Sequence, residues 1–312
     1  MRKEEFYFDS RDNTSKIHAV KWIPDEPPVF IVQIVHGMAE YVERFEEFAT
    51  FLTERNILVV GEDHLGHGKS VGNNPKGYFC KRDAATVIVR DVHRLKKVIE
   101  QEYPTLPYFI FGHSMGSLIT RNYLFKYGNG IDGAIISSTG MTSKSLLILT
   151  GVLMKVLAFF QGTKHESKLL DKLAFGSYCD RIENPVSKHD WLSKDPQVVK
   201  KYDENSLCGF IFTINGFFTL KVLSMNLYNE NNLNKMPKEL PVLFINGTED
   251  PVGNYGKSVK EVYESFIKLG MKDVTMKAYN GDRHELLNEI DKETVMGDIY
   301  EWICLKTKLD GV

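Results

Sequence analysis

Apolar runs and amphipathic segments alternate along the first 140 residues of the chain. Nearly continuous apolar runs, which are typical of strands buried on both faces of a sheet, fall at residues 29–35, 57–60, 108–111 and 133–138. Segments with the apolar spacing of amphipathic helices fall between them, at residues 44–55, 84–102 and 118–127. This order predicts a mostly parallel central sheet flanked by helices, with right-handed crossovers between the strands.

Two short segments before the first buried run alternate polar and apolar residues. They cover residues 4–8 and 16–22, and the turn-rich link 9–14 separates them. This pattern predicts an antiparallel hairpin at an edge of the sheet.

The alternation of strands and helices stops near residue 140 and resumes near residue 235. The resumed pattern predicts strand, helix, strand and helix, at residues 241–246, 258–269, 274–279 and 293–305. Residues 141–234 read instead as irregular helices rich in aromatic residues. We therefore expect a main domain made of residues 1–140 and 235–312. The insertion 141–234 is expected to form a helical lid over the carboxyl ends of the strands, where open α/β sheets bind ligands.

One segment of the expected lid, residues 145–160, is strongly apolar apart from Lys155. It is shorter than the roughly 20 residues that a helix needs to cross a bilayer, so no transmembrane segment is expected. A helix packed inside the lid is the favoured interpretation, and a transient contact between the lid and a membrane surface is the alternative.

The predicted strand at 108–111 runs into the sequence Gly112-His113-Ser114-Met115-Gly116, and a predicted helix follows directly. Strand, sharp turn and helix form the context that a G-x-S-x-G nucleophile elbow requires. A strained turn that exposes the serine hydroxyl needs small residues two positions before and after it, and Gly112 and Gly116 meet that need. The helix start also aims free N–H groups at an oxyanion. We favour Ser114 as a catalytic nucleophile over an ordinary turn.

A serine nucleophile needs a base and a carboxylate that orients the base. On this topology both follow the serine in the chain, the acid first and the histidine second. His284 is the one histidine after the expected lid, and it lies just past the strand 274–279. Asp250 lies just past the strand 241–246 and is the preferred acid, because its short side chain fits a tight strand-end turn. Glu249 is the alternative acid.

Four further polar residues receive less specific interpretations. Asp282 could also orient the histidine, but a solvated turn residue is favoured. The lid histidines His165 and His189 lie in charged segments and are expected to be solvated. His113 is expected to point away from the active face and to pack in the interior.

Two backbone N–H groups are predicted to bind the oxyanion. Met115 follows the nucleophile, and Met38 lies in the loop after the first buried run, where Gly37 allows close backbone approach. His64 and His67 could suggest a metal site, but no further ligand cluster accompanies them in the sequence, so a hydrogen-bonded loop is favoured. We expect neither a metal nor a cofactor.

Charge and cysteine content narrow the class of protein. The chain has 312 residues, with 39 Lys and Arg against 41 Asp and Glu, and its net charge of −2 makes nucleic acid an unexpected partner. Its first residues lack the apolar core of a signal peptide, which predicts a cytoplasmic protein. The cysteines form no C-x-x-C pair and are expected to be reduced structural thiols, at Cys80, Cys179, Cys208 and Cys304.

As a set, the motifs resemble the monoacylglycerol lipase and lysophospholipase branch of the α/β-hydrolases, which is also grouped with serine aminopeptidase-like hydrolases. The matching segments are His36-Gly37-Met38-Ala39-Glu40 with Arg44, Asp63-His64-Leu65-Gly66-His67-Gly68-Lys69-Ser70, Gly112-His113-Ser114-Met115-Gly116, Gly247-Thr248-Glu249-Asp250 and His284. The resemblance covers about residues 4–138 and 241–305. It implies an α/β-hydrolase fold, the triad Ser114, Asp250 and His284, and the oxyanion donors Met38 and Met115.

This chain departs from the family pattern at the loop after the first buried run. Family members often carry histidine where this chain has Tyr41, and glycine where it has Met38 or Ala39. The lid matches no stretch of the characterised lipases. Because the lid shapes the acyl and alcohol pockets, the resemblance does not extend to the identity of the substrate.

The sequence therefore predicts a serine carboxylic ester hydrolase that works through an acyl-enzyme. A lid rich in Phe, Leu and Met favours a small-molecule ester or single-chain lipid, of the monoacylglycerol or lysophospholipid type. The alternatives are a short-chain carboxylesterase, a ligand-binding protein that keeps the fold, and a peptidase or amidase of the proline-releasing aminopeptidase type. A peptidase would need lid acids to bind a free amine, for which the candidates are Glu166, Asp171, Asp180, Glu183 and Asp190.

Overall fold

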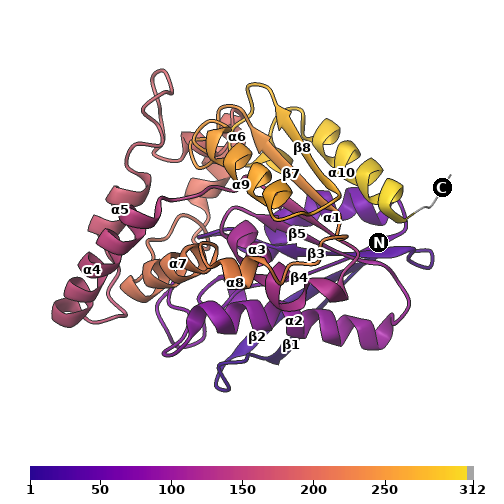
Figure 1. The fold of residues 1–312 in the computed structure, drawn as a ribbon, viewed down its shortest axis with the longest axis horizontal. Helices are drawn as coiled ribbons and strands as arrows, with labels where there is room; N and C mark the ends of the chain where they lie inside the picture. The colour runs from indigo at the N-terminus through magenta and orange to yellow at the C-terminus, as the bar shows by residue number, and fades with distance from the viewer. Residues whose placement is uncertain (308–312) are drawn as a thin grey trace.

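One eight-stranded sheet runs through the centre of the molecule (Figure 1). The computed structural model describes residues 1–307, so the last residues of the expected main domain, 308–312, lie outside the described residues. The strands are β1 (Arg2–Asp9), β2 (Lys16–Ile23), β3 (Phe30–Val35), β4 (Ile57–Glu62), β5 (Tyr108–His113), β6 (Gly133–Ser137), β7 (Val242–Gly247) and β8 (Val274–Tyr279). Their spatial order is β1-β2-β4-β3-β5-β6-β7-β8.

The predicted hairpin and parallel sheet are both confirmed. Strand β1 pairs antiparallel with β2, which pairs antiparallel with β4, and every further pairing is parallel. All residues of β3 to β7 are buried, as their continuous apolar runs predicted. Parallel strands end at the same edge of a sheet, so the loops after β3, β5, β6, β7 and β8 all begin at that edge.

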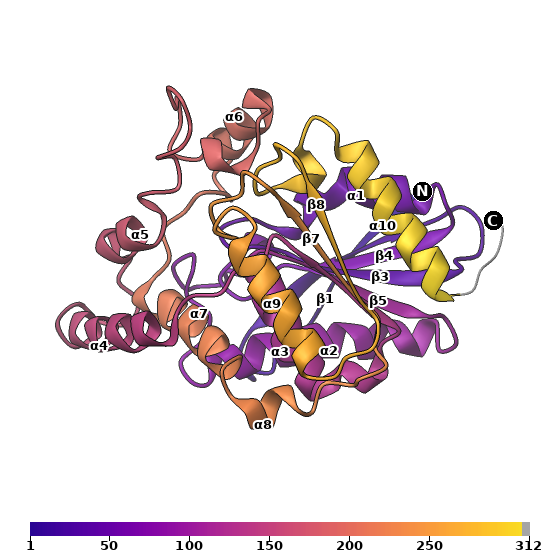
Figure 2. The same cartoon turned by 45° about the horizontal axis from the view of Figure 1, so that its top comes forward.

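Helices cover both faces of the sheet (Figures 1 and 2). On one face, α1 (Glu46–Thr53) and α10 (Lys292–Thr307) pack over a core that includes Phe48 and Ile299. The other face is covered by α2 (Ala84–Glu102), α3 (Met115–Tyr127) and α9 (Lys257–Lys268). These two apolar layers hold the strands, and with them the strand-end loops, in fixed positions.

The chain between β6 and β7 is helical, as its pattern predicted. It contains α4 (Lys144–Gln161), α5 (Lys168–Phe175), α6 (Pro196–Glu204), α7 (Ile214–Asn226) and α8 (Glu230–Leu233). In both views α4, α5 and α6 lie on the side of the sheet away from the two chain termini (Figures 1 and 2). Single 3₁₀ turns complete the fold at Val42–Phe45, Gly68–Ser70, Gly128–Gly130, Asp190–Leu192 and Leu286–Asn288.

The expectation that residues 145–160 are packed inside the lid is wrong. Helix α4 lies against α7, and only Leu147, Gly151 and Met154 of the helix are buried. Leu153 and Leu157 are partly buried, and the remaining large apolar side chains are exposed, with Phe159 at 83% and Phe160 at 77%. Within residues 1–307, α4 is the one helix that passes by length and composition as a membrane span, with a mean hydropathy of 1.6. A helix that is apolar on all sides gives no periodic signal of which face is covered.

Candidate active site

Ser114 occupies the turn between β5 and α3 in a strained conformation. Its φ of 54° and ψ of −115° lie in a region that side chains other than glycine rarely adopt. A Cβ on Gly112 would approach Thr120 Oγ1 to 2.3 Å, and one on Gly116 would approach the Val35 carbonyl oxygen to 1.9 Å. The turn therefore requires glycine on both sides of the serine, as its sequence context predicted.

Asp250 and His284 come together from the loops after β7 and β8. His284 Nδ1 lies 3.0 Å from Asp250 Oδ1, and both side chains are buried. The same Asp250 oxygen accepts a hydrogen bond from the Val252 N–H at 2.9 Å, which fixes the carboxylate. The alternative acid, Glu249, is exposed and makes no hydrogen bond to His284 within the described chain. The geometry favours Asp250 as the partner of this histidine.

Ser114 and His284 line the same cavity. The Ser138 hydroxyl donates to the His284 carbonyl at 2.6 Å, and the Ser114 N–H donates to the Ser137 carbonyl at 3.0 Å, so both residues are tied to the end of β6. Within residues 1–307 the Ser114 hydroxyl makes no hydrogen bond to the His284 ring. Such contacts often tighten only when substrate is bound.

The predicted oxyanion donors lie beside the serine. Within residues 1–307 the N–H groups of Met38 and Met115 donate to no protein acceptor, and both residues line the cavity. A Cβ on Gly37 would lie 3.3 Å from the Ser114 Cβ and 2.5 Å from Glu40 Oε1, so glycine is needed for this approach. Two unpaired donors beside a candidate nucleophile form an arrangement that can bind an oxyanion.

A buried ionic network lies beneath the site, and the sequence reasoning missed it, although Glu40 and Arg44 were among the residues of the family resemblance. Glu40 accepts from the Gly37 N–H at 2.6 Å and from Arg44 at 2.6 Å. Arg44 also donates two hydrogen bonds to Glu285, each of 2.7 Å. The network therefore joins the loop that holds Met38 to the residue that follows His284.

His113 completes this network and corrects one expectation. It is buried, as expected, but it does not point away from the site, because its ring lies 4.9 Å from the His284 ring. Its Nδ1 lies 2.9 Å from Glu40 Oε1. Burial alone would lower the pKa of His113, but the hydrogen bond and charge of Glu40 outweigh burial and raise it. Burial alone would raise the pKa of Glu40, and His113 and Arg44 instead lower it.

Two residues that were expected to be solvated are held by partners. Asp282 is fully buried and accepts from Lys194 Nζ at 2.7 Å. His189 lines the cavity and is hydrogen-bonded to Asp203. Each partner comes from a segment too distant in sequence for local composition to reveal the contact. The other lid histidine, His165, is exposed.

His64 and His67 are buried next to His36, and the His64 N–H donates to His36 Nε2 at 3.0 Å. Burial lowers the pKa of His64 to about 4 and that of His67 to about 3, so both rings are neutral at pH 7. Burial and the charge of Asp63 raise the pKa of the neighbouring Glu62. Within residues 1–307, no three His, Cys, Asp or Glu side chains are placed to hold a metal ion.

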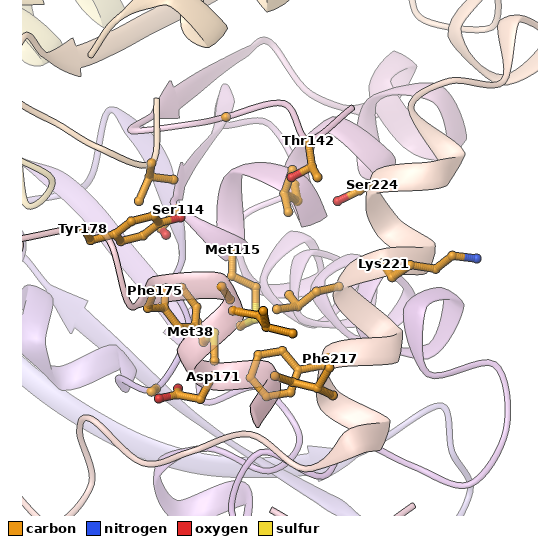
Figure 3. A pocket seen from close by; sticks show the side chains of 18 of the residues that line it. Met38, Ser114, Met115, Thr142, Asp171, Phe175, Tyr178, Phe217, Lys221 and Ser224 are labelled. Atoms are coloured by element: carbon orange, nitrogen blue, oxygen red, sulfur yellow. The ribbon is translucent and has the colours of Figure 1, made fainter. Parts of the chain in front are cut away.

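A cavity of about 1180 Å³ lies between the strand ends and the helices α4, α5 and α7. Figure 3 shows Ser114 at this cavity with Met38, Met115, Phe175 and Phe217 near it. Most of the wall is aliphatic or aromatic; it includes Leu146, Leu147, Leu149, Val152, Leu153, Met154, Val156, Leu170, Leu173, Phe210, Leu220 and Leu227. The volume exceeds the range of roughly 300–1,000 Å³ that is usual for small-molecule pockets.

The sheet order, the serine elbow and the residues at the strand ends define an α/β-hydrolase of the serine hydrolase class. Residues 26–291 match the model of the family described as serine aminopeptidase, S33, and the chain belongs to that family.

Individual relatives agree with this assignment. The chain is 27% identical over 287 residues to a monoacylglycerol lipase of Mycolicibacterium smegmatis, a match that covers 90% of each chain. It is 28% identical over 293 residues to the monoglyceride lipase of Homo sapiens, covering 93% of this chain and 87% of the relative. Among solved structures, a thermostable carboxyl esterase from Bacillus coagulans in complex with glycerol superposes with a TM-score of 0.89 at 29% identity, covering 97% and 98% of the two chains.

Proposed function

We propose that this serine hydrolase cleaves carboxylic esters of single-chain lipids, of the monoacylglycerol or lysophospholipid type. One observation carries the proposal: the strained Ser114 lies on the wall of a large cavity whose other walls are mostly apolar. An apolar cavity of this kind favours an acyl chain over a charged or strongly polar substrate. The names of the relatives, which are lipases and esterases, point to the same substrates.

In this proposal Ser114 Oγ attacks the ester carbonyl carbon while His284 Nε2 takes the serine proton. The Met38 and Met115 N–H groups stabilise the oxyanion, and each such donor typically contributes roughly 3 kcal/mol to the transition state. His284 then protonates the departing alcohol, and Asp250 stabilises the imidazolium through Nδ1. Water activated by the same histidine attacks the acyl-enzyme and releases the fatty acid.

We propose that residues 141–234 act as the lid of this site. One part of this segment is hydrogen-bonded to the main domain, and another part, helix α4, is largely exposed. The Glu285 N–H donates to the Leu192 carbonyl at 2.7 Å, and Arg283 donates to the Asp190 carbonyl at 2.7 Å, so the stretch around Asp190–Leu192 is fastened to the His284 loop. Helix α4 instead presents exposed apolar side chains. The fastened part would stay in place while α4 and α5 admit the substrate.

The exposed face of α4 supports a transient contact with a lipid surface, where the proposed substrates reside. An amphipathic or apolar helix that lies in the interface buries its side chains in the acyl boundary without crossing it. Because one face of α4 packs on α7, contact along the surface fits the fold better than a span. Phe159 and Phe160, at its carboxyl end, are the most exposed large apolar residues of the helix.

The aminopeptidase alternative needs an acid in the cavity to bind a free amine. Of the five lid acids considered from the sequence, only Asp171 lines the cavity among the described residues. Its pKa is raised by burial, while Lys188 and His189 act in the opposite direction. Because burial outweighs both and raises the pKa of Asp171, it disfavours the charged carboxylate that an ammonium group would need, so the ester hydrolase is favoured.

The cytoplasmic location expected from the sequence stays a prediction. The cysteines are free, with Cys80 and Cys208 buried and Cys179 and Cys304 partly exposed. Free thiols are typical of reducing compartments. Fractionation of cells that express the tagged chain, with thiol alkylation before lysis, would test both the location and the redox state.

A turnover series tests the proposed function. We expect hydrolysis of p-nitrophenyl esters to increase with acyl length, and we expect turnover of monoacylglycerol and lysophosphatidylcholine. Ser114→Ala should reduce kcat roughly a million-fold while the protein stays folded, because members of a triad act as a unit. Activity confined to the shortest esters would identify a small-molecule carboxylesterase. Turnover of amides but not of matched esters would identify the peptidase class.

A further inference from the structure

One buried positive charge in the cavity wall has no carboxylate partner among the described residues. Arg121 lies on α3, seven residues after Ser114; it is only 3% exposed and it lines the cavity. Its Nη1 donates to the Gly140 carbonyl at 3.1 Å and lies 3.4 Å from Thr139 Oγ1. Within residues 1–307, its Nε is fully enclosed without a partner, and its Nη2 donates to no protein group.

The contrast with Arg44 shows how unusual this charge is. Arg44 is held by two carboxylates, Glu40 and Glu285. Arg121 makes no salt bridge to any described residue, and no carboxylate contributes to its pKa. Burial lowers the pKa of Arg121 to about 10, so the guanidinium is still charged at neutral pH. A buried charge without a partner is costly unless a ligand supplies the partner.

We propose that Arg121 binds the phosphate of an anionic single-chain lipid, a lysophosphatidic acid, while its acyl ester lies at Ser114. This inference rests on the proposed function and names the headgroup that the same site prefers. A guanidinium presents planar N–H donors that match phosphate oxygens. Nη2 is the group left available for it, because Nη1 already donates to the Gly140 carbonyl and to the Thr139 hydroxyl.

The spacing along α3 fits such a ligand. Seven residues of helix separate the two Cα atoms by about 10 Å, and long helical side chains lean back toward the helix start, here toward Ser114. Six bonds join the ester carbonyl carbon of an acylglycerol phosphate to its phosphorus, which spans roughly 7 Å when extended. One glycerol unit is therefore enough to place the phosphate at Arg121.

The surroundings of Arg121 are suited to a polar headgroup. Thr142, Ser224 and Tyr228 line the cavity, and the Tyr228 hydroxyl donates to the Thr142 carbonyl at 2.7 Å. Figure 3 shows Thr142 and Ser224 next to each other, whereas the ammonium group of Lys221 points away from the other labelled side chains. The two other lysines of the wall, Lys172 and Lys188, are exposed. Among the described arginine and lysine side chains of the cavity wall, Arg121 is thus the buried one.

The first test compares two substrates that differ only in the phosphate, 1-lauroyl lysophosphatidic acid and 1-lauroylglycerol. We expect Arg121→Gln, which keeps a donor for the Gly140 carbonyl, to lower the ratio of their kcat/KM values by about 10- to 100-fold. Arg121→Lys should give an intermediate ratio, because it keeps the charge without the planar fork. Lys126→Gln, which removes an exposed charge from the same helix, is the matched control and should leave the ratio within about twofold.

An unchanged ratio, with kcat/KM lowered equally on the two substrates or on neither, would overturn the proposal. Arg121 would then serve only to anchor the loop at Gly140. A binding measurement then separates this failure from failure of the proposed function. In the Ser114→Ala protein, calorimetry should show lysophosphatidic acid binding about 10- to 100-fold more weakly once Arg121→Gln is added. If Arg121→Gln weakened binding in this way but the native chain hydrolysed no ester, the proposed hydrolase function would be rejected and the phosphate site would stand.

Inorganic phosphate distinguishes a lipid headgroup from a free anion as the ligand. We expect it to bind the Ser114→Ala protein at least a hundred-fold more weakly than lysophosphatidic acid, because only the lipid also buries an acyl chain. Equally tight binding of inorganic phosphate would overturn the lipid assignment. Lauric acid serves as a second probe. If it bound as tightly as lysophosphatidic acid and depended equally on Arg121, the phosphate assignment would be overturned in favour of a fatty-acid carboxylate.

Discussion

Ser114 can take its strained conformation only because the residues around it leave room for the backbone. Gly116 packs so closely on β3 that a Cβ would collide with the Val35 carbonyl oxygen at 1.9 Å. We expect Gly116→Ala to reduce the free energy of unfolding by about 3 kcal/mol and to abolish most esterase activity. Urea unfolding and p-nitrophenyl ester turnover would measure both effects.

Gly297 provides the matched control for this prediction. It lies within α10, and a Cβ there would meet no heavy atom within 4 Å. Gly297→Ala should raise the free energy of unfolding by about 0.5–1 kcal/mol, because alanine favours the helix. If both substitutions proved equally harmless, the close packing described for the elbow would be wrong.

Two neighbouring residues, Asp250 and Glu249, are the candidates for the acid that orients His284. Asp250 is buried against His284, whereas Glu249 is exposed. We expect Asp250→Asn to lower kcat about 10⁴-fold, because an amide stabilises neither the imidazolium nor the required tautomer. Glu249→Gln should change kcat less than about twofold. The reverse order of effects would move the acid by one residue.

The His113–Glu40 pair makes stability depend on pH in a definite direction. The pKa of His113 is raised above 6.5 and that of Glu40 is lowered below 4.5. The histidine contribution is therefore complete below pH 6.5 and is lost as the pH rises through the raised pKa. The glutamate contribution is complete above pH 4.5 and is lost as the pH falls through the lowered pKa.

We therefore expect His113→Gln to reduce the free energy of unfolding by about 3 kcal/mol near pH 6 and by less near pH 9. Urea unfolding of both proteins at the two pH values measures the difference. The same loss at both values would show that His113 does not titrate between pH 6 and pH 9, which would contradict this prediction.

The sequence was informative about residues whose position follows from chain order. Ser114, Asp250 and His284 could be proposed because each directly follows a predicted strand. The network below them could not, because its contacts are remote: Arg44 and Glu285 are 241 positions apart. The same holds for the pairing of Asp282 with Lys194. Local composition made Asp282 look solvated, and only the fold brings its partner to it.

Helix α4 is the element through which we expect the protein to bind lipid surfaces. We expect Phe159→Glu combined with Phe160→Glu to weaken binding to vesicles, and turnover of monoacylglycerol in them, by at least about tenfold. Neither residue lines the cavity, so turnover of a dissolved p-nitrophenyl ester should change far less. Vesicle flotation and kinetic assays would measure the two effects.

The control for this prediction carries the same two charges elsewhere. Ile290→Glu combined with Leu305→Glu alters residues that are 71% and 76% exposed and lie outside α4. Vesicle binding should be retained by this variant. Equal losses in both variants would show that added negative charge, and not the face of α4, determines the contact.

Helices and strands could be predicted from the sequence where the apolar residues form a continuous run or recur with helical spacing. Strand β5 was predicted because its apolar run is continuous and all its residues are buried, and helices α2 and α9 were predicted because each buries one apolar face. The packing of α4 was predicted wrongly because its sequence is apolar almost all round, apart from Lys155, and cannot indicate which face meets α7. Composition identified the helix, and only the fold shows how much of it is left uncovered.

In the whole molecule, the rigid sheet positions the proposed reacting groups, and the inserted helical segment covers the acyl pocket. Every proposed reacting group lies in a loop at one edge of the sheet, where the two apolar layers fix the strand ends. The inserted segment is fastened to the His284 loop around Asp190–Leu192 and exposed at α4. This arrangement allows the acyl pocket to open without moving the catalytic groups that we propose.

Covalent labelling of the native chain is the sharpest test of Ser114 as the nucleophile. The Ser114 oxygen should attack the phosphorus of a long-chain alkyl fluorophosphonate, with its proton passing to His284 and fluoride leaving, so that the phosphonyl group stays bound to Ser114. Mass spectrometry of the digested protein would locate the adduct, with Ser114→Ala as the control. We predict one adduct, on the peptide that contains Ser114, together with complete loss of ester turnover. An adduct on another residue, or turnover that persists after full labelling of Ser114, would contradict the proposed mechanism.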